Sequence, residues 1–170
     1  MFDFNNKKTV FKKSHLPFLV FAFAPLFLQG VDFSGMFDRS KNTPKVLPVT
    51  AQAYIGDKAI KLEVAKTALT QETGLTHRNS IPIDRGMLYR TTISKPLAFS
   101  GRAMEFATDL VFILGNKVVG TYTNIAPCTD KCINYKLDRK YDSVMEVNTG
   151  IVEKLRIVNG TRIEIAYALE

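Results

Sequence analysis

Metal-ligating side chains are scarce in this sequence. Its 170 residues include only two cysteines and two histidines, and His15 lies in the apolar N-terminal region. A tetrahedral zinc site takes about four ligands, so Cys128, Cys132 and His77 supply too few unless acids join them. We therefore expect no metal centre and no cofactor.

Motifs of nucleophilic and phosphate chemistry are also missing. The chain has no Gly-x-Ser-x-Gly turn and no local Cys–His arrangement, which excludes the common hydrolase signatures. A phosphate-binding loop needs several glycines at fixed spacing and a lysine, and Gly86 stands without them. We expect His77 to be an exposed residue in the last turn of a helix, where a histidine favours the helix dipole.

Basic residues are not concentrated as a nucleic-acid site requires. The formal charge is +7, but four lysines and one acid before residue 32 carry +3 of it. The remainder holds 19 Lys and Arg residues against 15 Asp and Glu residues. No basic run interleaved with aromatic side chains is present, so we expect no nucleic-acid partner.

The sequence lacks a hydrophobic run long enough for a confident bilayer span. The apolar stretch after the N-terminal lysines runs uninterrupted from Leu16 to Leu28, which is 13 residues, whereas a spanning helix needs about 20. Pro17 and Pro25 also disfavour a regular helix interior. A basic start followed by a short apolar region is typical of a secretory signal. We expect residues 1–31 to be a signal peptide or a membrane anchor that contacts the membrane through residues 16–30, and the domain to be extracytoplasmic (periplasmic or secreted). A buried core helix is the alternative.

A linker and a β-rich domain follow. Residues 32–50 contain Gly35, Pro44 and Pro48 without a sustained period, as linkers do. Residues 59–64 (AIKLEV) alternate apolar and charged side chains, which predicts a strand with Lys61 and Glu63 facing outwards. The preceding Gly-Asp at 56–57 predicts a hairpin turn.

Further short strands alternate with turn signals along residues 51–170. The best helix is expected at 67–78, capped by Thr67 and ended by Asn79. One helical turn is expected within 151–157. The expected strands are 86–89, 97–100, 110–114, 118–123, 143–147 and 162–167, of which 110–114 and 118–123 form the clearest hairpin. This pattern predicts a mostly β fold, a compact sandwich or barrel-like domain with one short helix.

The order of these motifs resembles the domain-of-unknown-function family 192 (DUF192). EVAKTALTQETGLTHRNSIPIDRGMLY (63–89) resembles the family's opening signature, and DLVFILGNKVVG (109–120), IAPCTDKCINY (125–135) and VMEVNTGIVEKLRIVNGTRI (144–163) follow in order. The resemblance implies a compact, commonly exported β domain without an established general activity. It breaks at 99–109, where FSGRAMEFATD replaces the typical Phe-Trp-Met-Lys-Asn-Thr motif.

Cys128 and Cys132 are the only cysteines, and they follow Pro127 with three residues between them. In an oxidising compartment the natural expectation is a disulfide that fixes a loop. A metal pair, a redox pair and free thiols are the alternatives.

Four residues are candidates for ligand binding: Arg78, Arg102, Asp109 and Tyr135. Asp109 at the edge of an apolar strand could serve as an acid or base; it could equally bond backbone amides or pair with Arg102 or Arg78. We expect a non-catalytic module that binds a small ligand or an envelope protein through a loop face with Arg102, Asp109 and the cysteine loop. The alternative is an envelope-associated enzyme that uses Asp109.

Overall fold

The computed structural model of this chain describes residues 43–91 and 97–168. The expected signal or anchor (1–31) and most of the expected linker lie outside the described residues. Among the residues that are described, no helix is both long and apolar enough to cross a bilayer.

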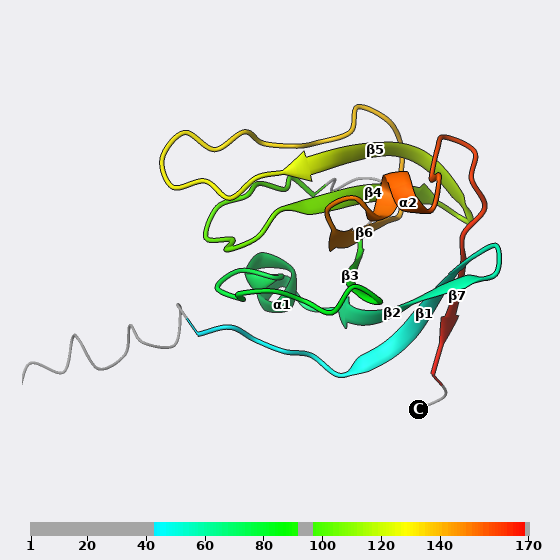
Figure 1. Ribbon diagram of the computed structural model, residues 1–170, viewed down its shortest axis with the longest axis horizontal. Helices are drawn as coiled ribbons and strands as arrows, with labels where there is room; N and C mark the ends of the chain where they lie inside the picture. Colours follow the sequence, from blue (N-terminus) through cyan, green and yellow to red (C-terminus); the bar gives the residue numbers. More distant parts are fainter. Residues whose placement is uncertain (1–42, 92–96, 169–170) are drawn as a thin grey trace, which may run out of the picture.

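Seven strands form one curled sheet, and two short helices lie beside it (Figure 1). The strands are β1 (Val49–Ile55), β2 (Lys58–Ala65), β3 (Arg85–Arg90), β4 (Thr108–Leu114), β5 (Lys117–Ile125), β6 (Ser143–Asn148) and β7 (Glu164–Tyr167), and the helices are α1 (Ala68–Thr73) and α2 (Ile151–Lys154). The strand order is β5-β4-β6-β3-β2-β1-β7. Neighbours are antiparallel except β2 and β3, which run parallel and are connected through α1.

The sheet curls until its two ends approach each other. The segment before β7 reaches the start of β5, where Val118 N donates to Thr161 O at 2.9 Å and Gly160 N donates to Val118 O at 2.8 Å. An isolated bridge joins Lys117 and Arg162. The domain is therefore a half-barrel, a curled sheet whose edge strand β5 is linked by these few bonds to the segment before β7.

Both faces of the central strands are buried. One face carries an apolar cluster that includes Val111 and Ile113 of β4. The other face carries a second cluster, which includes Leu110 and Phe112 of the same strand. The continuous apolar run of β4 is therefore needed because no face of this strand meets water.

The structure confirms the mostly β class and both expected hairpins. The turns at 56–57 and 115–116 connect β1 to β2 and β4 to β5. Helical structure within 151–157 is also found, as α2. The expected strand at 97–100 is wrong, because only Phe99 forms an isolated bridge, with Tyr135.

The helix begins where the sequence predicts and ends earlier. Thr67 caps α1 in a reciprocal arrangement with Thr70, in which each side chain accepts from the backbone of the other. The helix then stops at Gly74 (φ 50°) instead of continuing to Arg78. A Cβ at Gly74 would lie 2.5 Å from the Tyr89 hydroxyl oxygen, so close packing on β3 and the positive φ both require glycine there.

Candidate functional site

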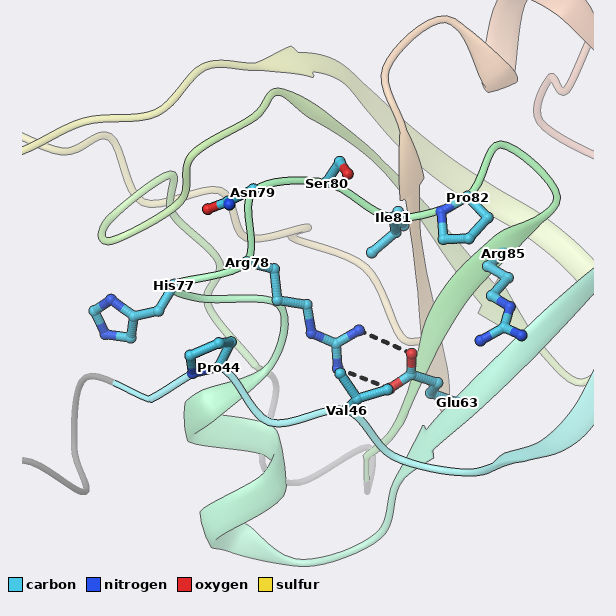
Figure 2. A pocket seen from close by; sticks show the side chains of 10 residues that line it. All are labelled: Pro44, Val46, Glu63, His77, Arg78, Asn79, Ser80, Ile81, Pro82 and Arg85. Atoms are coloured by element: carbon cyan, nitrogen blue, oxygen red, sulfur yellow. Dashed lines mark hydrogen bonds and ion pairs between the residues drawn. The ribbon is translucent and has the colours of Figure 1, made fainter.

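A shallow pocket of about 290 Å³ opens between the loop after α1 and an extended segment before β1 (Figure 2). We call this segment, residues 44–47, the strap, and the cavity the strap pocket. Its lining residues are Pro44, Val46, Glu63, His77, Arg78, Asn79, Ser80, Ile81, Pro82 and Arg85. The loop supplies most of them, while β2 and β3 contribute one residue each.

A buried ion pair forms one wall of the strap pocket. Arg78 Nη1 and Nη2 donate to the two carboxylate oxygens of Glu63 at 2.8 and 2.7 Å, and the side chains are 5% and 3% exposed. Figure 2 shows the guanidinium facing the carboxylate in this two-bond geometry. Such planar pairing is specific to arginine. Burial makes each charge dependent on the other, because an unpaired buried charge is strongly unfavourable.

The strap is bonded to both members of the ion pair. Arg78 Nη2 donates to the carbonyl oxygen of Lys45, and Leu47 N donates to Glu63 Oε2 at 2.7 Å. Hydrogen bonds to charged groups contribute about 1.5–3 kcal/mol each. The pair therefore fixes the chain that enters the domain as well as the loop after α1.

The loop that carries Arg78 is held in an uncommon backbone conformation. His77 has a φ of 60°, and its N–H donates to Ala103 O at 2.7 Å; Ala103 itself has a φ of 56°. Non-glycine residues at positive φ persist where surrounding structure fixes them, and they cluster at functional sites. His77 is thus half-buried beside the pocket and follows the helix end by several residues, which corrects the expected position in the last helical turn.

Behind this loop lies a second buried polar group. Tyr89 Oη donates to Glu146 Oε2 at 2.7 Å, and Thr108 Oγ1 donates to Glu146 Oε1 at 3.0 Å. Burial raises the pKa of Glu146, and these two bonds and the charge of Arg78 act against that rise. Burial, followed by the nearby Glu146 charge, also raises the pKa of Tyr89. Glu63 and Glu146 are thus two buried carboxylates that pair with Met87 from its two neighbouring strands, and the charge of Arg78 acts on both.

Asp109 is buried, and its carboxylate is bonded to the backbone. It is 0% exposed, Oδ1 accepts from Asn124 N at 2.9 Å, and Oδ2 accepts from Val152 N at 3.1 Å in the first turn of α2. The sequence left open whether Asp109 bonds backbone amides or pairs with an arginine. In the structure it bonds backbone amides and does not pair with Arg78 or Arg102. Because Asp109 is buried, the expected exposed loop face lacks it.

Arg102 and Tyr135 lie along a loop fixed by a disulfide. The structure contains the Cys128–Cys132 disulfide, with a Cα–Cα separation of 5.6 Å. Arg102 donates to the carbonyl oxygens of Thr129 and Asp130 at 3.2 and 3.1 Å. Tyr135 exchanges backbone hydrogen bonds with Phe99. Arg102 and Tyr135 therefore lie on two loops that are bonded to each other.

The stretch where the sequence departs from the family pattern packs against this loop. A Cβ at Gly101 would lie 1.9 Å from the Ala126 carbonyl oxygen. Cys128 N also donates to Gly101 O at 2.9 Å. Glycine at this position is therefore required by the close approach of two backbone segments.

Glu63 is the site residue that the sequence missed. Strand alternation placed it outwards beside Lys61, but the structure buries it under the loop that carries Arg78. The expected outward position was wrong because the loop that carries Arg78 and the strap cover the second face of β2 at this residue. Over residues 43–91 and 97–168, no three His, Cys, Asp or Glu side chains form a metal-binding group.

Two solved structures have a fold similar to that of this chain, which places it in a class of curled β-sheet domains. A protein of unknown function from Novosphingobium aromaticivorans DSM 12444 is 22% identical, with a TM-score of 0.59 over 72% of this chain and 92% of that one. A protein from Sinorhizobium meliloti 1021, described as "a putative transcription regulator", is 22% identical, with a TM-score of 0.60 over 71% and 96% of the two chains. At this identity the likeness shows the fold alone.

The family comparison narrows this class. The family DUF192, described as "Uncharacterized ACR", matches residues 50–165, and the chain belongs to it. The resemblance found in the sequence is thereby confirmed. The comparison with curated proteins gave no match.

Proposed function

We propose that this chain is a non-catalytic, extracytoplasmic binding module whose ligand site is the strap pocket. The observation that carries the proposal is the pocket itself, where half-buried and exposed polar side chains surround a buried Arg78–Glu63 pair. Ligand pockets combine apolar walls with a few fixed polar groups, and the strap pocket has both kinds of lining residue.

The geometry of Asp109 favours binding over catalysis. A general acid or base must reach a substrate proton within hydrogen-bond distance. Both oxygens of Asp109 accept backbone N–H groups in a fully buried position. The alternative of an envelope enzyme that uses this residue therefore has no geometric support.

The extracytoplasmic location rests on the apolar segment at 16–30 and on the disulfide. Disulfides persist in oxidising compartments and are rare in the cytosol. We propose a small ligand or an envelope protein as the partner, with membrane contact through the N-terminal segment and no nucleic acid. The mixed surface charge of the domain supports this last point.

Location can be tested separately from binding. A membrane-impermeant amine reagent should label the chain in osmotically shocked cells of the native host before the cytoplasmic membrane is lysed. Labelling that requires lysis would contradict an extracytoplasmic location. Sequencing the N-terminus of the purified chain distinguishes a cleaved signal from a retained anchor.

Binding can be tested by purifying the whole chain from the native host in mild detergent. Native mass spectrometry should detect a co-purified small molecule or protein that is released on denaturation. Asn79→Trp, which fills the strap pocket, should abolish this species. The matched control Asn159→Trp, an exposed position in the turn before β7, should retain it. A partner retained equally by both variants would rule out the strap pocket.

A further inference from the structure

The size of the strap pocket limits what it can hold. Pockets for drug-sized ligands measure about 300–1,000 Å³, and this one is about 290 Å³. It therefore fits a compact organic molecule or the last one or two residues of a peptide. The apolar part of the lining, Pro44, Val46, Ile81 and Pro82, suits a branched aliphatic group.

The charges around the pocket favour an anion. The charged lining residues are two arginines, Arg78 and Arg85, and one acid, Glu63. Glu63 is neutralised by Arg78, and the adjacent Asp84 is engaged by Lys61 Nζ at 2.9 Å. Within the described parts of the chain, the half-buried Arg85 guanidinium makes no side-chain hydrogen bond, although, after the hydrogen bond from Lys61, its charge helps to lower the pKa of Asp84. Lys61 and Arg85 share this one carboxylate, so one positive charge is left beside the pocket.

A second donor is held in the pocket wall. Arg78 uses Nη1 and Nη2 for Glu63 and the strap, whereas its buried Nε–H has no acceptor among the described residues. Buried donors are almost always paired in native proteins. Nε is covered by protein atoms, so an oxygen-bearing ligand would supply its acceptor after a small shift of the pocket wall. Figure 2 shows Arg78 among the side chains that surround the cavity.

We propose that the strap pocket binds a small carboxylate that carries a branched apolar group. Arg85 would neutralise the carboxylate, Arg78 Nε–H would donate to it, and the proline-rich walls would contact the aliphatic part. The left-handed His77 and its bond to Ala103 hold this loop in place before binding. This inference rests on the proposed function, since it names the ligand class of the same pocket.

The test uses the whole chain in detergent micelles and the probe N-acetyl-leucine. Titration should shift the backbone amide resonances of residues 77–81 and 83–85. N-acetyl-leucinamide, which has the same shape and no charge, should bind about tenfold more weakly or worse, as expected when a charge-assisted hydrogen bond is lost. Arg85→Gln should weaken N-acetyl-leucine binding to a similar extent. The control Arg139→Gln, which removes an exposed arginine elsewhere, should leave it unchanged.

Each outcome decides the proposal. Equal binding of acid and amide, or an unchanged affinity in Arg85→Gln, would overturn the carboxylate assignment and leave the pocket as a binding site. No shifts with either probe at millimolar concentration would also overturn it, while the co-purification experiment judges the binding module independently. An acetylated tetrapeptide that ends in leucine distinguishes the source: tighter binding than N-acetyl-leucine indicates a chain terminus, and weaker binding indicates a free small acid.

Discussion

Removing one member of the Arg78–Glu63 pair should destabilise the domain severely. The side chains are 5% and 3% exposed and share two hydrogen bonds of 2.8 and 2.7 Å. Breaking a buried pair by removing one partner costs about 3–5 kcal/mol, because the other charge is left uncompensated. Since small domains have unfolding free energies of about 5–15 kcal/mol, either Glu63→Gln or Arg78→Met removes a large part of the total.

The double variant Glu63→Leu with Arg78→Met distinguishes charge pairing from simple loss of contacts. Replacing both ions by apolar side chains of similar size is often neutral or better. The double variant also leaves Leu47 N and Lys45 O without their hydrogen-bond partners. Each of these groups that stays buried lowers the unfolding free energy by about 1–3 kcal/mol. We therefore expect the double variant to lose clearly less stability than the sum of the single variants.

The assay is urea unfolding of the whole chain, followed by tyrosine signals because the chain has no tryptophan. With a urea slope of about 1–3 kcal/mol/M, each single variant should lower the midpoint by about 2 M. The control Glu164→Gln disrupts an exposed pair with Arg162, which is worth about 0–1 kcal/mol. Single losses below about 1 kcal/mol, or a double loss equal to their sum, would refute the charge-pairing argument.

Two further predictions concern other buried features. Burial raises the folded-state pKa of Glu146 above its ordinary value, so its proton is held more tightly in the folded than in the unfolded state. The stability that this group contributes is present at acidic pH and is lost as pH rises through the raised pKa. The stability of the native chain relative to Glu146→Gln should therefore be greatest at about pH 4 and should decrease towards neutral pH. A difference in unfolding free energy that does not change with pH would contradict this. For the disulfide, the double change Cys128→Ser and Cys132→Ser should lower the unfolding free energy by only about 2 kcal/mol, because the closed loop is short. A loss above about 4 kcal/mol would show that this loop supports the core.

Local sequence signals were sufficient where local physics determines structure. The hairpin turns at 56–57 and 115–116, the Thr67 cap and the buried run of β4 depend on residues within a few positions of one another. The end of α1 was missed because the need for glycine at position 74 comes from its close contact with the Tyr89 hydroxyl group. Tyr89 lies on β3, fifteen residues later in the chain.

The candidate site depended on contacts that periodicity cannot predict. Alternation in β2 correctly assigned its apolar face, but the opposite face is covered by a loop, so Glu63 is buried. Arg78 was recognised as a candidate from its residue type, whereas its partner and the strap became evident only in three dimensions. Asp109 was recognised with several possible roles, and the structure provides backbone amides for both of its oxygens.

The pairing of β1 with β7 has a topological consequence. Ala51 lies opposite Tyr167, and Ala168 N donates to Thr50 O at 2.9 Å, so the start of the first strand along the chain lies beside the end of the last one. A short covalent connection between these ends, with new termini opened at the Gly115–Asn116 turn, would keep every strand pairing intact. The half-barrel is therefore close to a cyclic arrangement that a circularly permuted chain could adopt.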